Sequence, residues 1–103
     1  METIVDVIRT KTADFVFEVA RNQKIEVDKP KVIEKMTKTF RERVVQIIET
    51  MKSEAKEADF MGGLDRGKLH SLPKRVAMVT LNHECLKYAH DLLDIPFPSV
   101  SKL

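Results

Sequence analysis

The residues that this chain uses sparingly exclude several kinds of protein. Cys85 is its only cysteine, so no disulfide can form within the chain, which favours a reducing compartment and a cytoplasmic protein. Charged residues interrupt every apolar stretch, so we expect no segment that spans a bilayer and no membrane partner. The N-terminus also lacks the basic region and the apolar run of a secretory signal.

Glycine and proline are scarce as well. The chain has 3 Gly and 4 Pro, and this disfavours an all-β fold with many tight turns. Pro30 and Pro73 lie where helices should begin, and the three glycines fall between residues 62 and 67. We therefore predict an all-α fold, a three-helix bundle with an elongated second helix.

The remaining composition is typical of one folded unit. Hydrophobic residues make up 43% of the 103 residues and charged residues 33%, which matches a globular domain rather than a disordered chain. We predict a single helical domain over residues 1–95 and a flexible C-terminal tail over residues 96–103. The net charge of +2 gives no general reason to expect nucleic acid or an anionic membrane as a partner.

The last three residues, Ser101-Lys102-Leu103, match a peroxisomal import signal. Such a signal acts only on a free C-terminus in a eukaryotic cell. We therefore expect a cytoplasmic protein, with peroxisomal import as the alternative.

The first helix is predicted over residues 3–23. Ile4, Ile8 and Val19 recur on one face at helical spacing. Residues 15–17, Phe-Val-Phe, are β-like in composition, so a strand at this point is the alternative.

The second helix is predicted from Lys29 to Asp59, with Asp28 as its N-cap and Val27 and Val32 as a hydrophobic staple across the cap. About 31 residues would extend roughly 45 Å, which is longer than one small core needs. Apolar residues advance along it by three or four positions. Five residues of this stripe form a candidate protein interface: Met36, Phe40, Val44, Ile47 and Met51.

The third helix is predicted over residues 72–94. It carries two apolar stripes, one through Leu81 and Cys85 and the other through His83 and His90. A helix that is apolar over such a wide arc packs between neighbours, so we expect it at the centre of the core.

The charge order along the second helix is the reverse of the order that a helix dipole favours. Residues 28–43 carry six basic and three acidic side chains, whereas residues 44–61 carry two basic and four acidic ones. We expect compensation from Lys74 and Arg75 beside the acidic end, from an antiparallel second copy of this helix, or from an acidic ligand on the basic half. A solvated face without function is the alternative.

The antiparallel arrangement predicts a homodimer. Lys35 and Lys38 would approach acidic residues of the other copy, and Phe40 and Ile47 would lie near the seam. A monomer in which the first and third helices cover the same stripe is the competing interpretation.

The basic segments suggest nucleic acid as an alternative partner. Residues 63–75 carry four basic residues and one acidic residue, and a basic loop before a helix N-terminus suits phosphate contacts. No aromatic residue is interleaved for base stacking. The candidate anion or nucleic-acid contacts are Lys31, Lys35, Lys38, Arg41, Arg66, Lys68, Lys74 and Arg75.

The spacing of the histidines and the cysteine does not predict a metal site. His83 and His90 share a helix face, but Cys85 lies about 200° round from His83, so the three side chains cannot converge on one ion. We interpret the histidines as buried residues that hydrogen-bond locally and Cys85 as a small core residue.

Two acidic pairs with i, i+3 spacing could bind magnesium if adjacent helices brought them together. In an antiparallel hairpin, however, Glu54 and Asp91 would lie roughly 25 Å apart. We expect no enzyme, no cofactor and no metal. The leading hypothesis is a small non-enzymatic helical adaptor or regulatory protein that binds another protein or itself, and nucleic-acid binding is the alternative.

Overall fold

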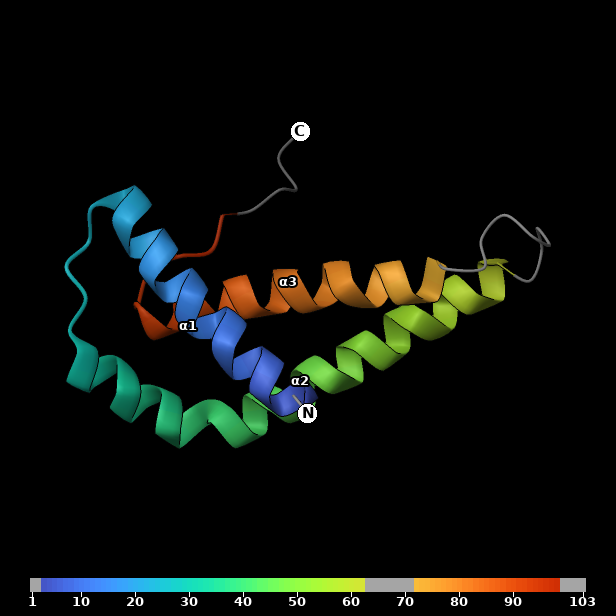
Figure 1. Cartoon of the computed structure of the whole chain (residues 1–103), viewed down its shortest axis with the longest axis horizontal. Helices are drawn as coiled ribbons and strands as arrows, with labels where there is room; N and C mark the ends of the chain where they lie inside the picture. Colours follow the sequence, from blue (N-terminus) through green and yellow to red (C-terminus); the bar gives the residue numbers. More distant parts are fainter. Residues whose placement is uncertain (1–2, 63–71, 99–103) are drawn as a thin grey trace.

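The computed structural model describes residues 3–62 and 72–98. They form three helices: α1 spans Ile4–Gln23, α2 spans Lys29–Gly62 and α3 spans Leu72–Leu92 (Figure 1). These two ranges contain no strand, which confirms the all-α prediction.

The first helix begins and ends with recognisable caps. The Thr3 hydroxyl accepts a hydrogen bond from the Asp6 N–H at 3.2 Å, and the Asp6 carboxylate accepts one from the Thr3 N–H at 3.3 Å, so the two residues form a capping box. The Thr3 hydroxyl also donates to the Asp6 carboxylate at 3.0 Å, and this bond, together with the one from the Thr3 N–H, lowers the pKa of Asp6. At the other end Lys24 is left-handed, and the Ile25 N–H bonds the Ala20 carbonyl at 2.8 Å. The β-like residues 15–17 lie within this helix.

The second helix is elongated, as predicted, with 34 residues. Asp28 caps it, because its carboxylate accepts a hydrogen bond from the Lys31 N–H at 3.4 Å. Val27 and Val32, the two residues of the predicted staple, are half-buried on either side of that cap and pack against the same apolar cluster. The helix ends at Gly62, three residues beyond the predicted end.

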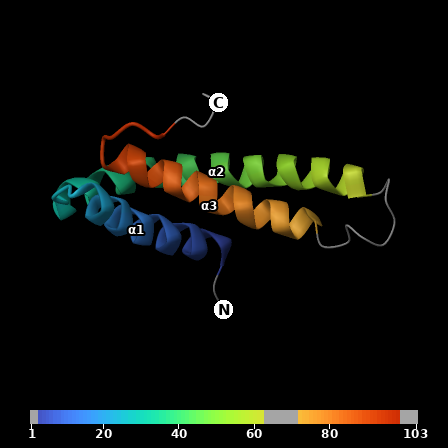
Figure 2. The same cartoon turned by 90° about the horizontal axis from the view of Figure 1, so that it is seen from above.

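The third helix lies between the other two. Figure 2 shows α3 with α2 on one side and α1 on the other, and α3 packs against both. The molecule measures 49 × 38 × 20 Å, so its thickness equals about two helix diameters. The prediction that α3 occupies the centre of the core is therefore confirmed. Within the described ranges, no helix has an apolar stretch long enough to cross a membrane.

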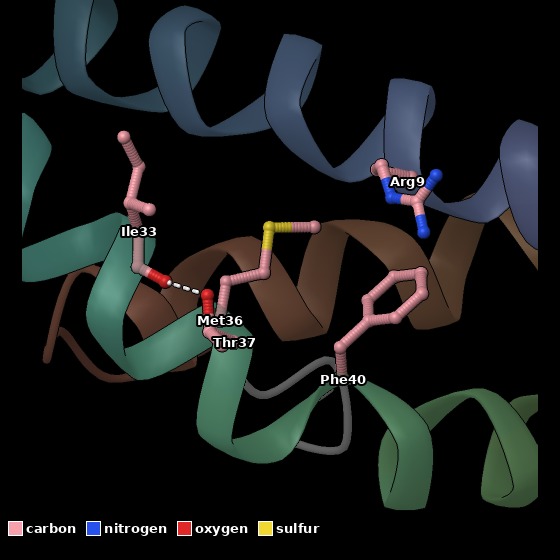
Figure 3. A pocket seen from close by; sticks show the side chains of 5 residues that line it. All are labelled: Arg9, Ile33, Met36, Thr37 and Phe40. Carbon is pink, nitrogen blue, oxygen red and sulfur yellow. Dashed lines mark hydrogen bonds between the residues drawn. The ribbon is translucent and has the colours of Figure 1, made fainter.

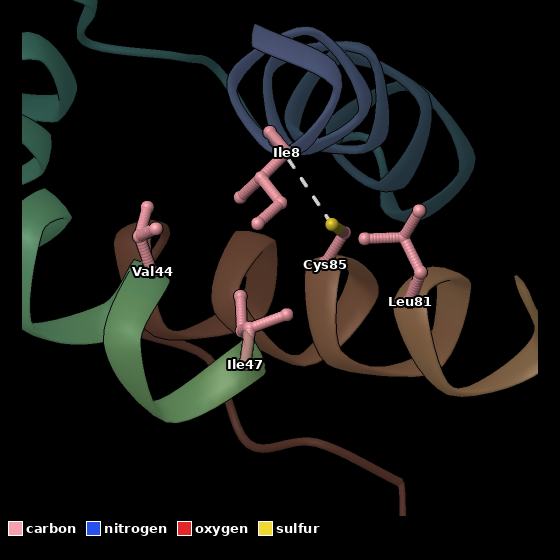
Figure 4. Close-up of a cluster of buried hydrophobic side chains, with 5 residues drawn as sticks. All are labelled: Ile8, Val44, Ile47, Leu81 and Cys85. Atoms are coloured by element: carbon pink, nitrogen blue, oxygen red, sulfur yellow. Dashed lines mark hydrogen bonds between the residues drawn. The ribbon is translucent and has the colours of Figure 1, made fainter. Parts of the chain in front are cut away.

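All three helices meet in a first buried cluster (Figure 4). Ile8 from α1, Val44 and Ile47 from α2, and Leu81 and Cys85 from α3 are each at most 7% exposed. Burying a side chain of this size contributes about 1.5–3 kcal/mol. The cluster therefore holds the first half of α1 against the middle of α2.

A second cluster lies nearer the 24–28 connection. It contains Val16 of α1 with Tyr88, Ala89 and Leu92 of α3. On the α2 side it is bordered by Met36 and other half-buried residues rather than by fully buried ones. α1 and the first half of α2 are thus each held by α3 more than by each other.

Candidate functional site

An apolar groove lies between α1 and the first half of α2. It consists of two adjoining hollows, of about 370 and 270 Å³, that share Ile33 and Met36. We call it the α1–α2 groove. Its lining residues are Arg9, Ala13, Val16, Phe17, Val27, Lys29, Val32, Ile33, Met36, Thr37 and Phe40.

Large apolar side chains of the groove are exposed to solvent. Ile33 is 63% exposed and Phe17 is 52% exposed, although both are large apolar side chains. Figure 3 shows the side chains of Ile33 and Met36 rising from α2 toward α1, with α3 behind them. The Thr37 hydroxyl donates to the Ile33 carbonyl at 2.8 Å, so it already has its partner in the backbone. Contiguous exposed apolar surface of this kind is typical of a binding site.

Two cations stand at the two ends of the groove, each over an aromatic ring. The Arg9 guanidinium lies 4.9 Å from the centre of the Phe40 ring, and the Lys29 ammonium lies 6.0 Å from the centre of the Phe17 ring. Neither hollow has a carboxylate in its lining. The charged groups that face the groove are therefore of one sign.

The groove exists because two helices diverge. The start of α1 is fixed on the middle of α2 by Ile8, Val44 and Ile47. From there α1 and the first half of α2 separate toward the 24–28 connection (Figure 1). Side chains such as Ile33 and Phe17 are too short to fill the widening space, so it stays open on the side away from α3.

The basic half of α2 faces the acidic end of α3. Lys35 and Asp94 form an ion pair, as do Arg43 and Asp91, and Lys31 lies 3.9 Å from the Asp94 carboxylate. The hydrogen bond from Lys35, aided by the positive charge, lowers the pKa of Asp94. The reversed charge order of α2 is thus compensated at its basic half by Asp91 and Asp94 of the same chain, which are not among the compensating groups that the sequence suggests.

Lys35 also caps the end of α3. Its ammonium donates to the Asp91 carbonyl at 2.6 Å, which is one of the last carbonyls of that helix. Asp94 is left-handed, and the Ile95 N–H closes the turn on the His90 carbonyl at 3.1 Å. This turn brings the Asp94 carboxylate onto α2, and a cation at a helix C-terminus is favourable.

Tyr88 ties the centre of α3 to α2. The Thr39 hydroxyl donates to the Lys35 carbonyl at 2.9 Å, so it accepts from the Tyr88 hydroxyl at 2.7 Å. The Arg43 guanidinium lies 4.8 Å from the centre of the Tyr88 ring. Burial raises the pKa of Tyr88.

The five residues of the predicted interface have different environments. Val44 and Ile47 are 7% and 1% exposed and belong to the core, so a partner that docks on the folded chain does not reach them. Met51 is half-buried against the same cluster. Met36 and Phe40 line the groove and remain available.

The same burial bears on the antiparallel register. Ile47 was expected near the seam but is covered by α1 and α3, and Lys35 is paired with Asp94 of its own chain. Lys38 forms an ion pair with Glu34 at 3.1 Å. The apolar reason for that register is therefore met within one chain at Ile47, and the electrostatic reason is met there for Lys35 and Lys38.

The predicted nucleic-acid contacts are divided between the described and the remaining residues. Lys31 and Lys35 share Asp94, and Arg41 is exposed. Arg66 and Lys68 lie outside the described residues, as do the side chains of Lys74 and Arg75. Around Lys31 and Lys35, the carboxylates of Asp91 and Asp94 would repel a phosphate backbone.

His90 and Cys85 lie where sequence analysis expected them. His90 is buried and its Nδ1 lies 2.9 Å from the Leu86 carbonyl, but His83 is exposed, so the interpretation of both histidines as buried residues was wrong for His83. Cys85 is fully buried, and burial raises the pKa of its thiol. Among the described side chains, no group of three or more His, Cys, Asp or Glu could hold a metal ion.

The predicted tail is anchored at one point. The Phe97 ring packs edge-on against His83 and His90, with ring centres 5.2 and 5.1 Å apart. Residues 96–98 therefore follow the surface of α3 rather than leaving it. Residues 99–103, which contain the predicted import signal, lie outside the described residues.

Comparison with known proteins identified no relative of this chain. No protein-family model, no curated protein and no solved structure matches this chain.

Of the groove lining, only Met36 and Phe40 belong to the predicted interface, and Arg9, Phe17, Lys29 and Ile33 are among the residues that do not. A signal for Phe17 was present, because Phe15 and Phe17 lie about 200° apart on a helix and cannot both face one core. Arg9 carried no such signal, since its place over Phe40 depends on how α1 crosses α2.

Proposed function

We propose that this protein is a small adaptor or regulatory module that binds a segment of another protein in the α1–α2 groove. The observation that carries the proposal is the joint exposure of Ile33 and Phe17 in one concave site. Covering the exposed part of each would contribute about 1 kcal/mol or more. A hollow lined by apolar side chains from two diverging helices is the usual receptor for an amphipathic helix.

The dimensions fit such a ligand. Lys29 and Phe40 lie eleven residues apart on α2, which is about 16 Å along the helix axis. That length matches about three turns of a bound helix, or about eleven residues. Anchors at i, i+3, i+4 and i+7 would then lie over Ile33 and Met36.

A matched pair of variants tests the proposal. Ile33→Asp and Val45→Asp each place one carboxylate on an exposed apolar position of α2, but only Ile33 lines the groove. The probes are helical peptides selected from a display library of about twelve-residue amphipathic sequences against the immobilised chain. We expect the selected peptides to lose at least about tenfold in affinity on Ile33→Asp and to keep their affinity on Val45→Asp.

Two results would overturn this function. The first is a selection that yields no peptide whose binding depends on Ile33. The second is equal loss of binding in both variants, because that would place the contact elsewhere or reflect a general effect of added negative charge.

A further inference from the structure

The positive charges at the two ends of the groove indicate which kind of peptide it binds. This inference rests on the proposed protein-binding function. Arg9 and Lys29 lie at opposite ends of an otherwise apolar lining, and no carboxylate lines either hollow. We infer that the groove selects an apolar helical segment with acidic residues at both ends.

Each cation lies over an aromatic ring of the groove. Arg9 rests over Phe40, and Lys29 rests over Phe17, so each side chain lies along the apolar lining with its charge near the ring. A carboxylate arriving at either end finds a cation already positioned there. A bound segment with basic ends would meet like charge at both places.

The two ends are not equivalent. Arg9 already pairs with Asp6 at 3.4 Å, whereas Lys29 has no ion pair with any described residue. The full charge of Lys29 is therefore available to a ligand, and part of the Arg9 charge is not. We expect the acidic end that meets Lys29 to contribute more to selectivity than the end that meets Arg9.

The separation of the cations favours a peptide over a single-headed ligand. Arg9 stands beside Phe40 and Lys29 lies about 16 Å away along α2, so one carboxylate cannot reach both. A helix of about three turns carries acidic side chains at both ends and apolar ones between them. This spacing excludes a simple fatty acid as the ligand that uses both cations.

The test uses three synthetic peptides with Leu at i, i+3, i+4 and i+7, differing only in their ends: Glu, Gln or Lys. Binding to the full chain is measured by fluorescence anisotropy at low and high salt. We expect the Glu-ended peptide to bind about threefold to tenfold more tightly than the Gln-ended one, and the preference to fall as salt rises. The Lys-ended peptide should bind most weakly.

Charge reversal sharpens the test. Lys29→Glu should reverse the preference at its end, so that a peptide with Lys there regains affinity. Lys87→Glu is the control, because it makes the same charge change at an exposed position of α3 outside the groove lining. Arg9→Gln should reduce the preference less than Lys29→Gln does.

The possible failures are distinguishable. If all three peptides bind equally and Ile33→Asp abolishes that binding, the inference about acidic ends is overturned and the proposed function stands. If no peptide binds through Ile33, both are overturned. A doubling of the 11.8 kDa mass in light scattering that Ile33→Asp removes, without peptide binding, would assign the groove to a second copy and would also overturn both.

Discussion

Two isoleucines on one face of α2 differ in burial: one lies in the core and the other is exposed. Ile33 and Ile47 belong to the same apolar stripe of α2 and lie fourteen residues apart, about 21 Å along its axis. Ile47 is 1% exposed between α1 and α3, whereas Ile33 is 63% exposed in the α1–α2 groove. A continuous stripe therefore serves as core over one half of α2 and as surface over the other.

The difference shows that an apolar stripe predicts which helix face is to be buried. It does not predict whether another helix of the same chain or a second molecule covers that face. The middle of α2 is covered because Ile8 and Leu81 approach it from two sides. The first half is contacted by α3 but only partly by α1, because α1 has diverged by then (Figure 1). Uncovered stripe of this kind is where a second molecule gains most by binding.

Thiol labelling should show the largest contrast between the two regions. Cys85 lies in the filled cluster, and burial raises its pKa, so its thiol stays protonated and covered. A cysteine placed by Ile33→Cys, in a Cys85→Ser background, lies in the open groove. We expect the groove thiol to react with a maleimide at least about a thousandfold faster, because Cys85 reacts only after the core opens. Equal rates in the folded proteins would mean that the cluster is not closed.

Truncating the two isoleucines should separate the regions energetically. Ile47→Ala should lower the free energy of unfolding by about 2–5 kcal/mol, since it leaves a cavity among α1, α2 and α3. Ile33→Ala should change it by no more than about 0.5 kcal/mol. Urea denaturation followed by circular dichroism measures both, and Val45→Ala is the control for helix propensity on an exposed site. A large loss from Ile33→Ala would show that the groove is part of the core.

Tyr88→Phe tests how α3 supports the first half of α2. The variant removes the hydroxyl that lies 2.7 Å from Thr39, and we expect a loss of about 1 kcal/mol in the free energy of unfolding at neutral pH. The raised pKa also has an alkaline consequence. The wild type should lose stability as pH rises above 10.0, the ordinary value, because the unfolded chain ionises there first. Tyr88→Phe should lack that loss, and unchanged alkaline curves would contradict this role.

The smallest effect is expected at the exposed charge cluster. Lys35→Met removes the hydrogen bond and the charge that lower the pKa of Asp94, so that pKa should rise toward 3.8. Asp94 contributes stability above its unfolded pKa, and this contribution is lost as pH falls through the folded pKa. NMR titration of the Asp94 carboxyl measures the shift, and Lys38→Met is the control, because Lys38 pairs with Glu34 and not with Asp94. No change in the Asp94 titration would remove Lys35 as the cause.

Local features of the fold could be predicted from the sequence because their causes are local. Asp28 caps α2 through its own next residues, and Val27 and Val32 flank that cap. The wide apolar arc of α3 predicted that this helix packs between the other two. Cys85 was recognised as a core residue because it lies on that arc.

The candidate site could be predicted only in part. Met36 and Phe40 were identified from the stripe, but so were Val44 and Ile47, which the chain itself buries. The pairing of Lys35 with Asp94 was missed, since fifty-nine residues separate them. The spacing of apolar residues in α2 and α3 does not predict which ends of the two helices pack together.

The sequence by itself determined three helices, the N-caps of α1 and α2, and the apolar faces that each helix must cover, because hydrogen bonds and side-chain periodicity act within a few residues. Only the tertiary structure decided which part of the α2 stripe became core and which became groove. That choice depends on the angle at which α1 leaves α2 after Ile8. The angle is set by packing among residues far apart in the chain, and a small divergence at one end becomes an open hollow at the other.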